Sequence, residues 1–195
     1  MNREETKSRC ADAYSRDIVA LLLGDSYHPG GTVLTRRLAD HLALAPGLRV
    51  LDVASGRGTT ALLLVDVYGV RSDGVDYAAA NTALARGAAQ ATGLADRAAF
   101  TTDDAERLPY DNAVFDAVVC ERALCTFPDK HRAAAEFARV LKPGGRLGIT
   151  DVTADLDRLS PELRGLAARI ADSRTLRAYA ELLVSAGLQT PSPAG

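Results

Sequence analysis

The sequence lacks any long apolar run, and this absence excludes a membrane-spanning helix. Its longest apolar runs cover residues 18–23 and 61–65, far fewer than the roughly 20 residues that a spanning helix needs. The first nine residues are polar and charged, which is not the pattern of a secretory signal peptide. We therefore expect no membrane partner.

The sequence also lacks an excess of charge and a cysteine framework. Its formal net charge is −2, so neither a nucleic-acid surface nor a membrane-binding patch is expected. Lysine is scarce, at 3 residues against 20 arginines; with so many alanines, we interpret this as coding bias and not as a basic site. Cys10, Cys120 and Cys125 are few, odd in number and without paired spacing. They predict no disulfide framework and a reducing, cytoplasmic compartment.

Strand-like and helix-like segments alternate along these 195 residues. A 47% hydrophobic and 25% charged composition is ordinary for one globular domain. Alternation of this kind predicts an α/β fold, a doubly wound, mainly parallel Rossmann-like sheet with helices on both faces and a ligand at the carboxyl ends of its strands. The expected strands are residues 49–53, 70–76, 98–102, 114–120 and 146–151, and the expected helices are residues 11–23, a segment from Thr32, 60–67, 78–92, 129–141 and 174–185.

Three regions are expected. Residues 1–46 form an N-terminal helical cap, residues 47–188 form the sheet domain, and residues 189–195 are a proline-containing tail and not a strand. Residues 142–145, Lys-Pro-Gly-Gly, predict a tight turn before the fifth strand. That strand would then be a sheet edge with unpaired backbone groups, through which two copies could pair as a homodimer.

The first candidate site is the turn after the first strand, Asp52-Val-Ala-Ser-Gly56-Arg-Gly58. Glycines allow the backbone to approach a ligand, and the following helix offers free amide donors. The same glycine spacing also fits a dinucleotide-binding fingerprint. Asp52 argues against that alternative because a carboxylate repels a pyrophosphate but suits a cationic ligand. An ordinary turn without a ligand stays a further alternative.

Three more polar positions follow strand ends. Asp76 could accept hydrogen bonds from both ribose hydroxyls of a nucleotide, or could instead cap the next helix. Asp104 could accept from an adenine amino group, with residues 108–110 as an apolar wall, or could lie in a charged surface loop. Glu121 and Arg122 emerge at the end of the fourth strand; a salt bridge between them is the alternative without a ligand.

Taken together and in order, five segments resemble the motifs of class I S-adenosylmethionine-dependent methyltransferases: residues 50–61, 74–77, 104–110, 115–121 and 141–151. The resemblance implies that S-adenosylmethionine is the cofactor. It also implies that Asp52 and the two glycines surround the methionine part, that Asp76 binds the ribose, and that Asp104 and Ala105 lie at the adenine. The expected cofactor-binding residues are Asp52, Ala54, Ser55, Gly56, Gly58, Asp76, Tyr77, Asp104, Ala105 and Glu121.

Within that family, residues 141–147 and 151–164 resemble small-molecule methyltransferases of the ubiquinone-biosynthesis and arsenite type. Four features depart from the pattern. Ala54 replaces a glycine, Asp73 interrupts the second strand, Arg122 and Arg169 stand about where the similar arsenite enzymes carry thiols, and the C-terminal strand pair is missing.

The predicted activity is methyl transfer to a small-molecule acceptor. Because a sulfonium methyl is already activated, the protein mainly supplies proximity and orientation, and a base is needed only for a protonated acceptor. The catalytic candidates are His28, Glu121 and Cys125, and no metal site is expected. Arg122 and Arg169 favour an anionic organic acceptor. The alternatives are an arsenite or other metalloid methyltransferase, and a non-catalytic cofactor-binding or interaction protein.

Overall fold

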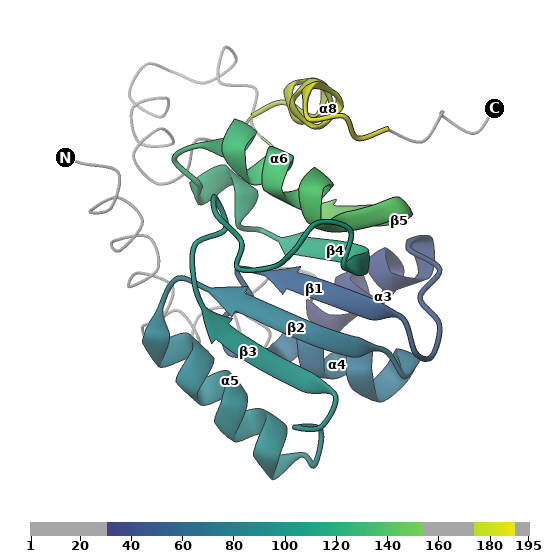
Figure 1. Cartoon of the computed structure of the whole chain (residues 1–195), viewed down its shortest axis with the longest axis vertical. Helices are drawn as coiled ribbons and strands as arrows, with labels where there is room; N and C mark the ends of the chain where they lie inside the picture. The colour runs from purple at the N-terminus through teal and green to yellow at the C-terminus, as the bar shows by residue number, and fades with distance from the viewer. Residues whose placement is uncertain (1–30, 154–173, 190–195) are drawn as a thin grey trace.

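A computed structural model describes residues 31–153 and 174–189 of the chain (Figure 1). The expected helix at residues 11–23, His28, Cys10 and Arg169 lie outside the described residues. Five parallel strands form one sheet in the order β3-β2-β1-β4-β5. They are β1 Arg49–Val53, β2 Arg71–Asp76, β3 Ala98–Thr102, β4 Phe115–Glu121 and β5 Leu141–Thr150. The predicted doubly wound fold is confirmed.

Helices cover both faces of this sheet because adjacent strand residues point to opposite sides. Helices α3 (Gly31–His41), α4 (Thr59–Tyr68) and α5 (Ala79–Ala91) pack on one face, which buries Val50 of β1 and Val119 of β4. Helices α6 (Lys130–Val140) and α8 (Leu176–Ser185) pack on the other, which buries Leu51 and Val118. A 3-10 turn, η1 (Leu124–Thr126), links β4 to α6.

The parallel arrangement brings the carboxyl ends of the strands to one edge of the sheet. We call this the ligand edge; Val53, Asp76, Thr102 and Glu121 end their strands there. From β1 the chain adds β2 and then β3 on one side, and it adds β4 and then β5 on the other side. The strand order therefore reverses at β1, between its neighbours β2 and β4. Such a reversal is where open α/β sheets bind ligands. The fold therefore places all four candidate segments around one point.

Strand β5 is the edge strand on one side of the sheet. The predicted tight turn at residues 142–145 is instead part of β5, where the pairing jumps from Phe115↔Leu141 to Ala117↔Arg146. The extra residues bulge outward with Gly144 at φ +77°, because β4 offers only one residue between these pairs. Helix α3 packs beside β5, with Leu38 and Leu42 against Gly148.

The other boundaries match the predictions to within one or two residues, and Asp73 does not disrupt its strand. Its carboxylate receives two hydrogen bonds from the Arg49 guanidinium, at 2.8 and 3.2 Å. The cation on neighbouring β1 offsets the cost of a carboxylate in β2.

Candidate active site

The turn after β1 is shaped by three residues in the left-handed region. Ala54, Gly56 and Gly58 have φ of +58°, +54° and +83°, a conformation that only glycine adopts without strain. A Cβ on Gly58 would lie 2.7 Å from the Phe100 ring, whereas a Cβ on Gly56 would meet nothing within 4 Å. Gly58 is therefore needed for packing, and Gly56 leaves open space at the ligand edge.

Asp76 ties the end of β2 to this turn. The residue is 7% exposed, and its carboxylate accepts from the Gly56 amide at 2.8 Å, the Ala78 amide at 2.8 Å and the Asn81 side chain at 3.1 Å. The bonds to Ala78 and Asn81 both reach Oδ1, so among residues 31–153 and 174–189 Oδ2 accepts only from Gly56. A carboxylate oxygen has two acceptor sites, and Oδ2 retains one for a ligand hydroxyl. Tyr77 follows with its side chain exposed.

Asp52 is buried in β1, and its carboxylate accepts from the Ala61 amide at the first turn of α4, at 3.1 Å. Burial, followed by the nearby charges of Glu121 and Asp76, raises the pKa of Asp52 well above its usual range. Ser55 lies in the same turn, and its Oγ is buried without a hydrogen-bond partner among the described residues. The turn thus combines an anionic environment with unused polar capacity.

Glu121 ends β4, and three threonine hydroxyls donate to its carboxylate. Thr60 donates at 2.7 Å, Thr35 at 2.9 Å and Thr150 at 3.3 Å. These threonines come from α4, α3 and β5, so Glu121 joins both helices of one face to the edge strand. Hydroxyl donors leave its negative charge in place, beside Asp52.

The salt bridge considered between Glu121 and Arg122 does not form. Arg122 has φ +55°, and its amide donates to the Thr150 carbonyl. This left-handed turn sends the two side chains apart. Nη1 of Arg122 is buried and has no hydrogen-bond partner in the part of the chain that the structure describes. A cationic group left in this state is a candidate partner for an anion.

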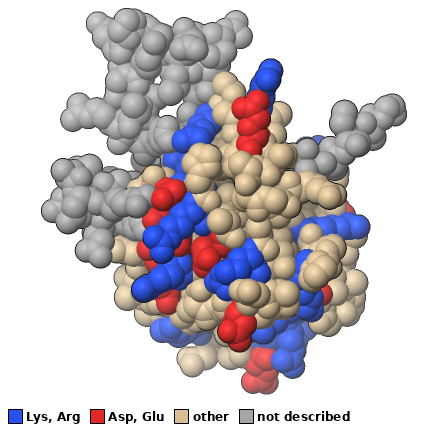
Figure 2. All heavy atoms as spheres, turned by 45° about the horizontal axis from the view of Figure 1, so that its top comes forward, with Lys and Arg blue, Asp and Glu red and all other residues tan. Residues whose placement is uncertain are grey.

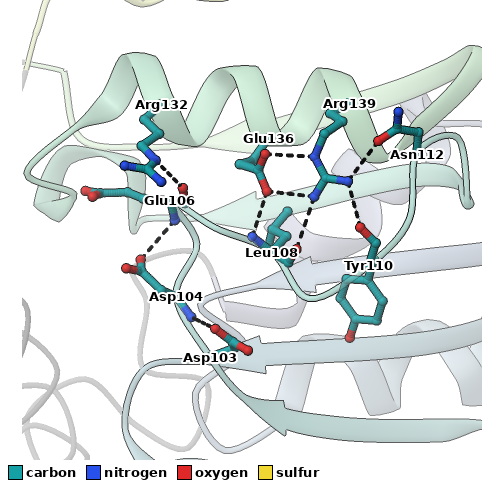
Figure 3. A network of polar contacts seen from close by, with 9 residues as sticks. All are labelled: Asp103, Asp104, Glu106, Leu108, Tyr110, Asn112, Arg132, Glu136 and Arg139. Carbon is teal, nitrogen blue, oxygen red and sulfur yellow. Dashed lines mark hydrogen bonds and ion pairs between the residues drawn. The ribbon is translucent and has the colours of Figure 1, made fainter.

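The loop between β3 and β4, residues 103–114, begins at the ligand edge with Asp104 and Ala105, and its later residues run away from that edge along α6 (Figure 3). Asp104 accepts from the Glu106 amide at 2.9 Å, a local turn that fixes its carboxylate at the start of the loop. The loop must reach the opposite end of the sheet because β4 runs parallel to β3.

This path contradicts the expected apolar wall of residues 108–110. Leu108 is buried in the core with α6, and Tyr110 packs edge-on against Phe115 with ring centroids 4.9 Å apart. Phe115 is the first residue of β4, so the ring of Tyr110 packs against the start of that strand. Burial raises the pKa of Tyr110 to about 12, which suits a neutral core phenol.

Sequence reasoning missed Glu106, Glu136 and Arg139. Glu106 is buried and accepts from the Asp129 amide at 2.7 Å; Arg139 and Glu136 pair at 2.7 Å on α6. Their i,i+3 spacing was visible in the sequence, but a pair of this kind usually lies on a solvated face. Only the folded β3–β4 loop provides further partners for the Arg139–Glu136 pair.

The two described cysteines are buried free thiols. Burial raises the pKa of Cys120 well above its usual value. Burial, with a hydrogen bond to Asp151, raises the pKa of Cys125 to about 12. Both therefore stay protonated near neutral pH, whereas nucleophilic or metal-binding cysteines act as thiolates.

The described residues show neither a metal-binding cluster nor a membrane-spanning helix. No group of three or more His, Cys, Asp or Glu side chains among them is placed to hold a metal ion. None of their helices is long and apolar enough to cross a membrane. Acidic and basic side chains intermingle on the face shown in Figure 2, as a net charge near zero would suggest.

Comparisons with known proteins agree with this geometry. Residues 51–149 match the family model described as a methyltransferase domain. The chain is 31% identical over 202 residues to 27-O-demethylrifamycin SV methyltransferase of Amycolatopsis mediterranei, covering 93% of this chain and 72% of that protein. It is 41% identical over 125 residues to demethylmenaquinone methyltransferase of Thermus thermophilus, covering 63% and 56%.

Among solved structures, the cyclase SpnF superposes with a TM-score of 0.72 at 29% identity, covering 84% of this chain and 60% of that one. The chain spans about half the length of several curated relatives that it matches. The cyclase is named for a reaction other than methyl transfer.

Proposed function

We propose, from the premise that this chain belongs to the methyltransferase-domain family, that it transfers a methyl group from S-adenosylmethionine to a small organic acceptor. One observation of the structure carries the proposal more than any other. The open space at Gly56 lies beside the Asp76 carboxylate. Glu121 is close enough to Asp52 for its charge to raise the pKa of Asp52.

The residues present fit this cofactor. Gly56 allows a ligand to approach the backbone, and Oδ2 of Asp76 can accept from a ribose hydroxyl. S-adenosylmethionine carries a cationic sulfonium and ammonium, which the charge of Glu121, and that of Asp52 once it is ionised, favour. A pyrophosphate would instead be repelled there, so the dinucleotide alternative is disfavoured. We assign Ala54, Ser55, Gly58 and Tyr77 to the walls of the same site.

The cofactor supplies an activated methyl group, and the chain holds the cofactor and the acceptor in position. The turn after β1 and the β3–β4 loop would hold the two ends of the cofactor, which leaves the β4 end for the acceptor. Glu121 is our candidate base, because the part of the chain that the structure describes offers its carboxylate hydroxyl donors and no cationic partner. Cys125 is disfavoured by a pKa of about 12. His28 lies outside the described residues and stays a candidate.

We propose an anionic acceptor, such as a carboxylate, because Nη1 of Arg122 lies at the end of β4 without a hydrogen-bond partner among the described residues. A metalloid acceptor is disfavoured because soft metal centres require thiolates. We also propose a cytoplasmic location, which suits free cysteines, and pairing of two copies along β5.

Calorimetry with S-adenosylmethionine, its demethylated product and NAD tests the cofactor. Binding of the first two without NAD supports the proposal; tight NAD binding alone would contradict it. Turnover is then tested with labelled S-adenosylmethionine against organic acids and arsenite. Cofactor binding without methylation of any acceptor would favour the alternatives, a cyclase-like activity or a non-catalytic binding protein.

A further inference from the structure

We infer that the polar face of α6, formed by Arg132, Glu136 and Arg139, is a positioning device for the adenine end of the cofactor. The inference rests on the proposed function, since it assigns the β3–β4 loop to the adenine. It adds residues that neither touch the proposed cofactor nor belong to the segments that resemble cofactor-binding motifs.

The three side chains share one face of α6 because they are spaced i, i+4 and i+7. They meet the loop in order along the helix, as Figure 3 shows. Arg132 donates to the Glu106 carbonyl at 2.8 Å, and Glu136 accepts from the Leu108 amide at 2.7 Å. Helix and loop run in the same direction, away from the ligand edge.

Arg139 makes five hydrogen bonds with its guanidinium group. Nε and Nη2 donate to the two oxygens of Glu136, at 2.8 and 2.7 Å. The remaining bonds reach the carbonyl of Leu108 at 3.1 Å, the carbonyl of Tyr110 at 2.7 Å and the side chain of Asn112 at 3.0 Å. Arginine has five N–H donors in a rigid planar fork, so each donor is matched by one acceptor.

The partners identify the role of this pair. Three of the five acceptors belong to the loop, and Glu136 binds the loop again through the Leu108 amide. A surface ion pair that only stabilised the helix would need none of these contacts. The side chains of Arg139 and Glu136 are 30% and 17% exposed, whereas those of the Arg177–Glu181 pair on α8 are 89% and 65% exposed.

The loop begins at the proposed adenine site. Asp104 and Ala105 stand directly before Glu106, whose backbone is held by Arg132 and whose carboxylate accepts from the Asp129 amide at the start of α6. With both ends of the loop fixed on α6, the Asp104 carboxylate has one position relative to the sheet. Recognition of the adenine amino group depends on that position, because a hydrogen bond tolerates little misalignment.

The test compares S-adenosylhomocysteine with S-inosylhomocysteine, in which a carbonyl replaces the adenine amino group. We expect the wild-type chain to prefer the adenosyl compound by about fivefold or more in Kd, the value of one hydrogen bond. Arg139→Lys, which keeps the charge but loses the fork, should bring the two Kd values close together. Arg177→Lys is the matched control and should keep the full preference.

A purely structural role of Arg139 would lower the melting temperature of Arg139→Lys but leave the ratio of the two Kd values unchanged, and that result would overturn the inference. Should Arg139→Lys fail to fold, Glu136→Gln decides by the same ratio. If the wild-type chain binds neither compound, the cofactor proposal itself fails. Hydrogen exchange then still tests whether α6 holds the loop. The Leu108 amide should lose protection from exchange in Arg139→Lys while the amides of the strands keep theirs. Unchanged protection of the Leu108 amide would overturn the inference.

Discussion

Asp52 is the last but one residue of β1, and Glu121 ends the neighbouring strand β4. Their carboxylates lie close enough for the charge of Glu121 to raise the pKa of Asp52. Burial contributes most to that shift, and Asp76 adds to it. Three acidic side chains held together in this way are unfavourable for the empty protein. Under the proposed function, a cationic ligand relieves the repulsion.

The first prediction concerns binding as a function of pH. Because Asp52 ionises only above its raised pKa, the preference for cationic S-adenosylmethionine over its uncharged-thioether product should increase as the pH rises through that pKa. Asp52→Asn should weaken S-adenosylmethionine binding about tenfold at high pH, the value of a charge-assisted contact, and should abolish the pH dependence. Calorimetry at a series of pH values measures both; a preference that is independent of pH in the wild-type chain would contradict the prediction.

The same group predicts the pH dependence of stability. Asp52 binds its proton more tightly when folded than when unfolded, where its pKa is about 3.9. Its contribution is therefore complete below that value and is lost as the pH rises through the raised folded pKa. Asp52→Asn should flatten this part of the profile of unfolding free energy against pH, measured by urea denaturation.

Asp116 provides the contrast for that experiment. Burial alone would raise the pKa of Asp116, but the Arg49 amide and Lys142 outweigh it, and the pKa is lowered. Its contribution is therefore present above the unfolded pKa and lost as the pH falls through the folded one. Asp116→Asn should alter only the acidic part of the profile; a change at higher pH would count against the assignment of that region to Asp52.

Glu121→Gln tests the coupling between the two carboxylates. Removing this charge should lower the pKa of Asp52, so that the S-adenosylmethionine preference appears at a lower pH than in the wild-type chain. The amide oxygen of glutamine can still accept from Thr60 and Thr35, and its NH2 group can donate to the Thr150 hydroxyl, so the fold should be retained. Thr35→Val is the control, because it removes one donor and leaves the charge. An unchanged midpoint in Glu121→Gln would mean that the two groups are not coupled.

Gly56→Ala and Gly93→Ala form a matched pair. Both glycines are left-handed, at φ +54° and +69°, and a Cβ on either meets nothing within 4 Å. Each substitution should cost about 1–2 kcal/mol of stability through backbone strain. Only Gly56→Ala should weaken cofactor binding as well, because its methyl group would occupy the space proposed for the ligand. Equal binding by both variants would remove Gly56 from the site.

Cys125→Ser tests the acceptor chemistry. Because the thiol of Cys125 is protonated near neutral pH, the rate of methylation of an organic acid should change by less than about tenfold in this variant. The rate should decrease by at least that much in Arg122→Ala, because this substitution removes a charged contact. Mass spectrometry of the products, with arsenite as the rival acceptor, measures both. Methylated arsenic that disappears in Cys125→Ser would overturn the preference for an anionic organic acceptor.

The sequence alone determined the sheet, its helices and the ligand edge. Buried parallel strands are continuous apolar runs, glycines and prolines punctuate them, and these local patterns do not depend on distant contacts. The positions of Asp52, Gly56, Asp76 and Asp104 at or just after strand ends followed from the same patterns. Parallel strands bring such positions to one edge whatever the rest of the chain does.

Only the tertiary structure decided which polar groups have partners. A salt bridge between Arg122 and Glu121 was one alternative, but a left-handed turn separates them and threonines from three other elements surround the carboxylate. Leu108 and Tyr110 were expected at the ligand, but the return path to β4 carries them into the core. Arg139 looked like an ordinary helix charge until the loop supplied its acceptors. Hydrogen bonds and burial depend on residues tens of positions apart, and the sequence pattern around one residue does not contain them.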